Sequence, residues 1–288
     1  MPGTLFVVAT PIGNLEDISQ RALRTLREVD LIAAEDTRRS AKLLSRYSIR
    51  RTMVSLHAHN EWREAPKLVE RLVAGSSIAL VSDAGTPGIS DPGEHLVRLA
   101  HQRGIKVVPI PGPSAIAAAL SVSGLPASQF VFMGFPPRSG RDRREWMAAL
   151  AAEPRTVVFF EAPHRIQATL TELTKLVNRQ IQIAREMTKV NEQLVISQTN
   201  GGAPAVPQLG EFVLVVGPEQ PTDSRGQSDA SNFAMALRMI GCLIVKCTFS
   251  DTEALELTSR ATGIDSRALK KALKKHRIQD KRRQSPVP

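Results

Sequence analysis

The sequence has few of the residues that build metal centres or aromatic binding surfaces. It holds two cysteines, Cys242 and Cys247, which lie in one apolar stretch and make no metal-ligand pattern. We therefore expect no metal and a reduced, cytoplasmic protein. Aromatic residues make up 4% of the chain. Stacking of nucleobases on aromatic side chains is therefore not expected to dominate binding.

Segments that would carry the chain to or through a membrane are also missing. No apolar run approaches the roughly 20 residues that cross a bilayer. One of the longest runs, Met239–Val245, is interrupted by Gly241. The first residues lack the basic segment that precedes the apolar part of a signal peptide. We expect no membrane partner.

Two common nucleotide-binding signatures are absent as well. The chain contains neither a Gly-x-Gly-x-x-Gly fingerprint nor a Walker loop. This absence argues against a Rossmann dinucleotide site and against a P-loop site.

Positive charge is in excess and is concentrated in two segments. The 288 residues carry a formal net charge of +10. Residues 260–283 hold ten Lys or Arg and two Asp, which gives +8, and residues 138–144 hold four Arg and one Asp, which gives +3. The rest of the chain is therefore nearly neutral. Two such patches favour contact with nucleic acid phosphates, and solvated charged segments are the alternative.

Short apolar runs alternate with helical periodicity over the first 218 residues. Leu5–Ala9 and Leu31–Ala34 are typical of buried strands, whereas the spacing of Ala22, Leu23 and Leu26 is helical. The alternation predicts an α/β fold with a largely parallel sheet covered on both faces. The length fits two domains.

The composition divides the chain into four parts. We expect an N-terminal α/β domain over 1–113, a second α/β domain over 114–218, a polar linker over 219–230 and a helical basic tail over 231–288. Two amphipathic helices in the tail are similar to a small helix-turn-helix unit.

Three loops rich in glycine or proline follow predicted strands. They are Ala9–Asn14, Ser82–Gly93 and Pro111–Ser114. Ligands of open α/β sheets bind beyond the carboxyl ends of the strands, so the loops should line one crevice. At the end of the second loop, Asp91-Pro92-Gly93-Glu94 predicts a helix start with Asp91 as its cap.

Several motifs, taken together and in order, resemble the tetrapyrrole methylase family. They extend over roughly residues 4–217. The segments that carry the resemblance are Ala9–Asn14, Ala34–Arg38, His57–Glu61, Val81–Gly93, Pro109–Ser114, Glu161–Arg165 and Ala184–Lys189. Val81–Gly93 and Ala34–Arg38 are most similar to a bacterial branch of the family that methylates a cytidine ribose 2′-hydroxyl in 16S rRNA.

The resemblance implies two α/β domains with S-adenosylmethionine in the cleft between them. It also implies a homodimer that acts on the small ribosomal subunit. The positions that would contact the cofactor are Pro11, Asp83, Ala84, Gly85, Thr86, Ser114, Ala115, Glu161, Arg185, Glu186 and Phe212.

Proton removal from a ribose hydroxyl calls for a positioned base or acceptor. Asp36 follows a predicted strand at the mouth of the crevice, and Arg38 could orient it or hold a phosphate. A purely structural Asp36–Arg38 pair at the helix start is the alternative. His57 is the next candidate base, and Asn60 could orient it.

The expected RNA contacts lie in the two basic segments. They are Arg138, Arg141, Arg143, Arg144, Arg267, Lys270, Lys271, Lys274 and Lys275. The tail helix could instead serve packing or dimerisation. Two other functions stay open at this stage: methylation of a small tetrapyrrole or corrinoid precursor, and RNA binding without catalysis.

Overall fold

The computed structural model describes residues 2–218, 236, 240, 243, 249–262, 264–271 and 273–274. The chain forms two compact units, residues 1–220 and residues 221–288. The first unit contains two sheets, each with its own helices.

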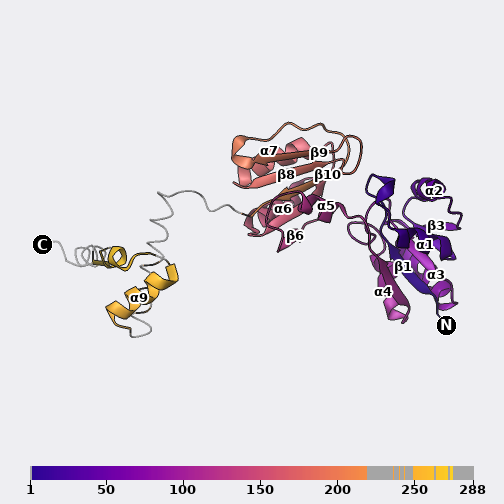
Figure 1. Ribbon diagram of the computed structural model, residues 1–288, viewed down its shortest axis with the longest axis horizontal. Helices are drawn as coiled ribbons and strands as arrows, with labels where there is room; N and C mark the ends of the chain where they lie inside the picture. The colour runs from indigo at the N-terminus through magenta and orange to yellow at the C-terminus, as the bar shows by residue number, and fades with distance from the viewer. Residues whose placement is uncertain are drawn as a thin grey trace. The chain divides into compact units, whose positions relative to one another are not determined.

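The first sheet consists of five parallel strands in the order β3-β2-β4-β1-β5. Its strands are β1 (Thr4–Val8), β2 (Leu31–Ala34), β3 (Met53–Ser55), β4 (Ile78–Val81) and β5 (Lys106–Ile110). The elements between them are η1 (Leu15–Asp17), α1 (Gln20–Glu28), α2 (Thr37–Arg46), α3 (Glu61–Val73) and α4 (Glu94–Gln102). Figure 1 labels β1 and β3 of this sheet together with its helices. The expected parallel α/β arrangement is confirmed.

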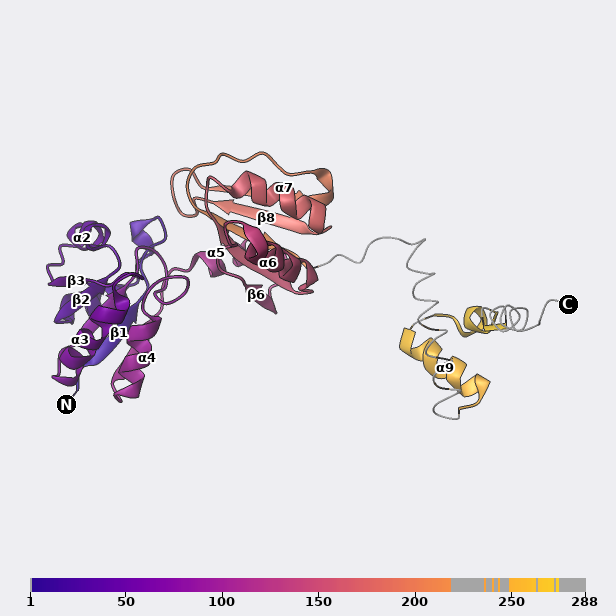
Figure 2. The ribbon, with the colours of Figure 1, turned by 180° about the vertical axis from the view of Figure 1, so that it is seen from behind.

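Both faces of this sheet are buried, which explains the continuous apolar strands. In β2, Leu31 and Ala33 pack with α3 and α4, whereas Ile32 and Ala34 pack with α1 and α2. Figure 2 shows α2, α3 and α4 beside this sheet from the side opposite to that of Figure 1. Each buried Leu or Ile side chain contributes roughly 1.5–3 kcal/mol, so the sheet is a rigid base for its loops.

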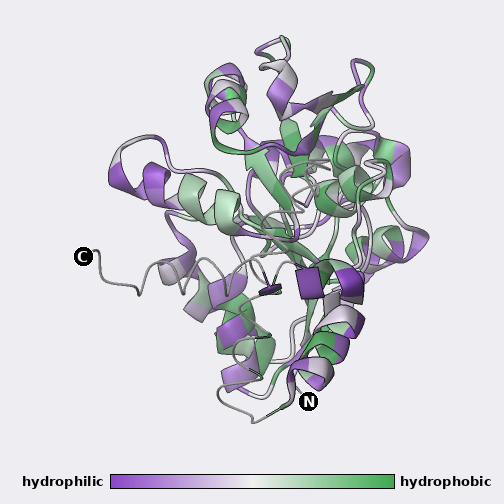
Figure 3. Ribbon diagram, turned by 90° about the vertical axis from the view of Figure 1, so that its left-hand side faces the viewer, coloured by the Kyte–Doolittle hydropathy of each residue, from purple (hydrophilic) through white to green (hydrophobic). Residues whose placement is uncertain are grey.

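The second sheet is mixed, in the order β6-β7-β10-β8-β9. Its strands are β6 (Phe130–Phe132), β7 (Thr156–Glu161), β8 (Gln180–Arg185), β9 (Gln193–Gln198) and β10 (Phe212–Val216). The associated helices are α5 (Ala115–Ser121), α6 (Gly140–Ala152), α7 (Ile166–Leu176) and η2 (Thr199–Gly201). Helices α6 and α7 cover one face of the sheet and α5 covers the other. In Figure 3, strands in the interior of the ribbon are green, the colour of hydrophobic residues.

The predicted cap of α4 is wrong. The helix begins at Glu94 after Gly93, which has φ +128°. Its first amides donate to a distant side chain: the buried carboxylate of Glu61 accepts from the backbone N–H of Gly93, His95 and Leu96 at 3.0, 2.9 and 3.2 Å. A tertiary contact thus replaces the local cap and leaves Asp91 for another role.

The second unit contains α9 (Asp251–Thr262) and a helical stretch that follows Asp265. The Asp265 carboxylate caps that stretch by accepting the backbone N–H of Arg267 and Ala268 at 2.9 and 3.1 Å. A small core holds the described residues together, and it includes Ala254, Leu255 and Leu269. The expected linker, 219–230, lies outside the described residues.

Candidate active site

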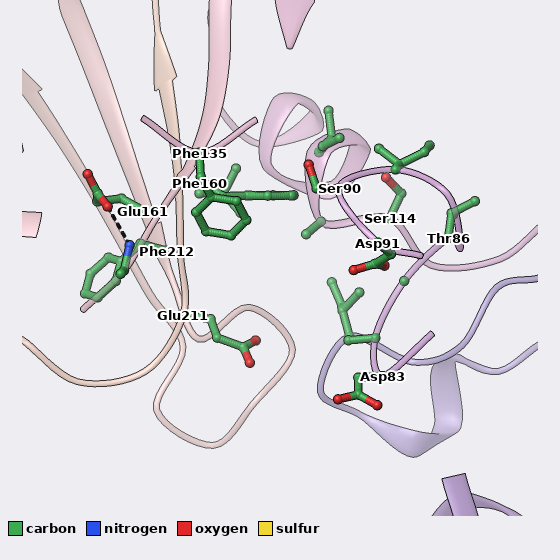
Figure 4. A pocket seen from close by; sticks show the side chains of 18 of the residues that line it. Asp83, Thr86, Ser90, Asp91, Ser114, Phe135, Phe160, Glu161, Glu211 and Phe212 are labelled. Carbon is green, nitrogen blue, oxygen red and sulfur yellow. Dashed lines mark hydrogen bonds between the residues drawn. The ribbon is translucent and has the colours of Figure 1, made fainter. Parts of the chain in front are cut away.

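A cavity of about 410 Å³ lies between the two sheets of the first unit. Residues from the loops after β1, β4 and β5 line it on one side, and residues from β7, β10 and the loops beside them line it on the other. Figure 4 shows Asp83, Thr86, Ser90, Asp91 and Ser114 opposite Phe135, Phe160, Glu161 and Phe212. Its size falls within the ~300–1,000 Å³ typical of small-molecule sites.

The three glycine- and proline-rich loops are tied to one another. Thr10 and Gly85 exchange backbone hydrogen bonds of 2.8 and 3.0 Å. The Thr10 hydroxyl donates to the Ser82 carbonyl at 3.1 Å, and the Thr86 hydroxyl donates to the Pro113 carbonyl at 3.4 Å. Gly85 has φ +79°, a conformation that favours glycine. The expectation that these loops meet at one crevice is confirmed.

Three carboxylates, Glu35, Asp83 and Asp91, lie along the first side of the cavity. The Glu35 carboxylate accepts the Asp83 backbone N–H at 3.2 Å, and the Asp83 carboxylate accepts the Asp36 backbone N–H at 3.0 Å. Arg39 forms an ion pair with Asp83 at 3.3 Å. The ends of β2 and β4 are therefore cross-linked through Glu35 and Asp83, while Asp91 forms no ion pair with any residue that the structure describes.

Burial and nearby negative charge make Asp91 unusual. Desolvation, helped by the charges of Glu35 and Asp83, raises the pKa of the Asp91 carboxyl to about 6, although a hydrogen bond from Ser82 opposes the shift. Desolvation also raises the pKa of Glu35. A carboxylate of pKa near 6 is a better proton acceptor than an ordinary aspartate.

In the structure Asp36 follows β2, and Arg38 binds its carboxylate. Asp36 caps α2 and accepts from the Arg38 backbone N–H, Nε and Nη2 at 2.8, 3.1 and 2.8 Å. These bonds lower the Asp36 pKa to about 2, chiefly through the Arg38 side chain. Neither residue lines the cavity, whereas their neighbours Glu35 and Arg39 do. The geometry supports the structural alternative for Asp36 and Arg38.

His57 and Asn60 also lie outside the cavity lining. The Asn60 side chain holds the turn between β3 and α3: its Oδ1 accepts the His57 backbone N–H at 2.8 Å, and its Nδ2 donates to the Ser55 carbonyl at 3.0 Å. The His57 ring lies 6.0 Å from that of His59. Asn60 therefore orients the backbone of His57 and not its ring.

Eight of the expected cofactor contacts line the cavity. They are Asp83, Ala84, Gly85, Thr86, Ser114, Ala115, Glu161 and Phe212. Pro11 is buried beside it without lining it, and its neighbour Ile12 takes that place. Arg185 and Glu186 do not line the cavity, and each binds the backbone of a residue near the second side of the cavity. Arg185 Nε donates to the Leu209 carbonyl at 2.7 Å, and the Glu186 carboxylate accepts the Glu211 backbone N–H at 3.0 Å.

A buried network fixes Glu161 at the second side of the cavity. The Glu161 carboxylate accepts from Arg165 Nη2 at 2.6 Å and from the Thr169 hydroxyl at 2.5 Å. Thr169 in turn accepts from Arg143 Nη2 at 2.9 Å, and Arg143 also pairs with Glu172 at 2.8 Å. The Arg143 side chain is only 12% exposed, so it supports the cavity wall from behind.

The other predicted RNA contacts that the structure describes are exposed. On the first unit these are Arg138, Arg141 and Arg144, and Arg141 pairs with Glu145 on the same helix at 2.6 Å. On the second unit they are Arg267, Lys270, Lys271 and Lys274, next to the buried Leu269. Lys275 lies outside the described residues. The described parts of both basic segments are thus mostly open to solvent.

Sequence reasoning missed many lining residues. Those missed include Ile12, Arg39, Ile89, Ser90, Asp91, Ile116, Phe135, Phe160, Gly210 and Glu211, whereas Glu35, which follows the predicted strand Leu31–Ala34, was a candidate acid or base and does line the cavity. Most of them are immediate chain neighbours of residues that were predicted. Asp91 stands in the longest of the three loops, which could have indicated a cavity residue. The pattern Asp91-Pro92-Gly93-Glu94 instead indicated a helix start with Asp91 as its cap.

Residues 4–200 match the family described as Tetrapyrrole (Corrin/Porphyrin) Methylases, and the chain belongs to this family. It is 45% identical over 275 residues to the Ribosomal RNA small subunit methyltransferase I of Xylella fastidiosa strain Temecula1, which covers 93% of this chain and 98% of that protein.

Two solved structures share the fold at low sequence identity. Diphthine synthase is 17% identical, with a TM-score of 0.60 over 75% of this chain and 90% of that chain. Uroporphyrin-III C-methyl transferase from Thermus thermophilus, complexed with S-adenosylhomocysteine, is 18% identical, with a TM-score of 0.52 over 75% and 97%. The chain is an S-adenosylmethionine-dependent methyltransferase, as the sequence predicted.

The cavity fits this cofactor. Small residues and Gly85 let the backbone come close to a ligand. Phe135, Phe160 and Phe212 offer apolar surface for an adenine ring. The Asp83 carboxylate supplies negative charge for a sulfonium or an amino group. Among the described residues, no group of three or more His, Cys, Asp or Glu is placed to hold a metal ion. No helix of the described part is long and apolar enough to span a membrane.

Proposed function

We propose that this methyltransferase modifies the 2′-hydroxyl of a cytidine ribose in 16S rRNA of the small ribosomal subunit. The observation that carries the proposal is the 45% identity, over nearly the full length of both chains, to a protein named Ribosomal RNA small subunit methyltransferase I. The exposed arginines of α6 and the exposed lysines of the second unit support it, because RNA binding depends on phosphate contacts.

In this proposal, residues that line the cavity bind the cofactor. Asp83, the Ala84–Thr86 segment, Ser114 and Ala115 contact it from the first domain, and Phe212 contacts it from the second. Bound S-adenosylmethionine would supply a methyl group already activated on a sulfonium. The protein must then align the ribose oxygen and accept its proton. Alignment alone is worth on the order of 7–11 kcal/mol in favourable cases.

Asp91 is the proton acceptor in this proposal. It lines the cavity, its pKa of about 6 leaves it ionised and basic at neutral pH, and no ion pair neutralises it within the part of the chain that the structure describes. Such a group contributes about 10²–10⁴-fold to the rate. Asp36 lacks these properties, because Arg38 stabilises its ionised form and holds it outside the cavity lining.

Three finer points belong to the same proposal. The protein acts in the cytoplasm, where ribosomal subunits are assembled, and it works as a homodimer. Residues 1–113 and 114–218 act as the two domains around the cavity, and 219–230 links them to the basic unit over 231–288. Light scattering coupled to size-exclusion chromatography measures the oligomeric state.

Methylation of isolated small subunits tests the proposed function. Subunits that lack the modification are incubated with the enzyme and radiolabelled S-adenosylmethionine, and the modified nucleotide is mapped. We expect label in 16S rRNA at one cytidine 2′-oxygen, and little label with the Asp91→Asn variant. Label on a base or on a ribosomal protein, or no label in 16S rRNA, would refute the proposal.

A further inference from the structure

An exposed aromatic cluster lies outside the cavity, on the first turns of α3 and α4. It consists of Trp62, His95 and Arg98, which we term the indole platform. The rings of Trp62 and His95 are 4.0 Å apart between centroids and tilted by 35°. Arg98 Nη2 lies 2.8 Å from His95 Nδ1, and its Cζ lies 5.7 Å from the centre of the Trp62 ring. Trp62 is nevertheless 71% exposed, so the indole presents a broad open surface to solvent.

Hydrogen bonds of the Glu61 carboxylate hold the two helix starts that carry the platform. Trp62 follows the buried Glu61, whose carboxylate accepts the backbone N–H groups of Gly93, His95 and Leu96. One carboxylate therefore fixes the start of α3 against the start of α4. The two stacked rings come from these two helix starts. A partner that stacks on the platform meets groups that are already ordered, which lowers the entropy lost on binding.

The platform also lies at the functional edge of the sheet. Helices α3 and α4 begin after the carboxyl ends of the parallel strands β3 and β4, where ligands of α/β sheets bind. His95 is four residues beyond Asp91, which lines the cavity. A short stretch of chain thus separates His95 from Asp91, and none of the three platform residues lines the cavity.

We propose that the indole platform stacks on an unpaired base of the substrate RNA next to the nucleotide that enters the cavity. This inference rests on the proposed function. Every nucleobase has a flat face that matches an exposed indole, and the contact tolerates any base. Arg98 adds a positive charge beside the stack. Its ion pair with Glu94 is long, at 3.4 Å, and both partners are exposed, so Arg98 can exchange Glu94 for a phosphate.

Steady-state methylation of small subunits measures the contribution of the platform. We expect Trp62→Ala to raise KM by about tenfold and to leave kcat within about twofold, because stacking holds the RNA and takes no part in the chemistry. Trp62→Phe should recover most of the affinity. Arg98→Ala should raise KM less. Its matched control is Arg103→Ala, at the other end of α4, where the arginine pairs with Glu70. That variant should resemble wild type.

Fluorescence tests the stack directly, without methylation. The chain has two tryptophans, so Trp62→Phe leaves only Trp146. The difference between wild type and Trp62→Phe reports Trp62 alone. A single-stranded RNA oligonucleotide should quench that difference signal, and heparin, which carries charge but no bases, should not. Quenching by the oligonucleotide combined with no methylation of subunits would refute the proposed function and keep the platform.

Two outcomes would overturn the inference. One is an unchanged KM for Trp62→Ala together with no quenching by the oligonucleotide. The other is a raised KM for whole subunits with unchanged affinity for free RNA and no quenching, because the platform would then contact a ribosomal protein. Circular dichroism of each variant confirms that it is folded.

Discussion

Replacing Asp91 with asparagine should make the protein more stable and less active at neutral pH. The fold raises the Asp91 pKa from 3.8 to about 6, so folding disfavours its charged form. Each pKa unit corresponds to about 1.36 kcal/mol, which sets an upper limit of ~3 kcal/mol for the cost of ionised Asp91 in the folded state. Asp91 is only partly buried, and water screens it. We therefore expect a gain of about 1–2 kcal/mol for Asp91→Asn near pH 7.5.

The sign of the pH dependence follows from the same shift. A raised pKa means that the folded state holds the proton more tightly than the unfolded state. This stabilises the fold fully below about pH 4, and the contribution is lost as the pH rises through 6. Urea unfolding of wild type and Asp91→Asn at several pH values measures the difference. The stabilities of the two proteins should converge toward pH 4, separate between about pH 4 and pH 6, and differ by a constant amount above pH 6.

The methyl-transfer activity of Asp91→Asn should fall, whereas its stability rises. We expect single-turnover methyl transfer by Asp91→Asn to fall about 10²-fold or more, with cofactor and RNA affinities changed far less. In wild type, kcat/KM should decline about tenfold per pH unit below an inflection near pH 6. Bound cofactor carries a positive charge that favours ionised Asp91, so the inflection in kcat should lie lower. A rate for Asp91→Asn within threefold of wild type would refute the role of Asp91 as proton acceptor.

Other residues give contrasting expectations. Asp36→Asn should keep single-turnover methyl-transfer rates within about threefold of wild type, because Asp36 pairs with Arg38 and caps α2. A hundredfold loss of this rate would instead identify Asp36 as the base. Arg143→Ala should lower the melting temperature by several degrees, since it leaves buried partners unsatisfied, whereas Arg144→Ala should leave melting unchanged and weaken RNA binding. Deleting 219–288 should leave cofactor affinity intact by calorimetry and make the salt dependence of RNA binding shallower; an equal slope would exclude this segment as an RNA contact.

Most of the fold could be predicted because its signals are local. Buried parallel strands appear as short apolar runs, and β2 was expected over the residues that form it, Leu31–Ala34. The cap of α4 could not be found in this way. Its acceptor, Glu61, is more than thirty residues from the amides that it satisfies. No local pattern identifies such a contact.

The candidate site was predictable by loop and less so by residue. Gly85 and Asp83 stand in a loop whose composition already indicated a ligand. The aromatic residues of the second side come from the second sheet and the loops beside it, and they carry no local signature. The low aromatic content also pointed away from stacking. Composition counts aromatic residues without showing where they lie, and it overlooked the exposed Trp62.

The neighbouring carboxylates Glu35 and Asp36 show why position decides chemistry here. Both follow β2, but the Arg38 side chain lowers the pKa of Asp36, while desolvation raises the pKa of Glu35. Only Glu35 lines the cavity, and there it accepts the Asp83 backbone N–H, which favours its ionised form. Among the described residues no backbone N–H donates to Asp91, and the charges of both Glu35 and Asp83 act on it. Its pKa of about 6 therefore makes Asp91 a better proton acceptor than an ordinary aspartate, which is the property that a base for a ribose hydroxyl requires.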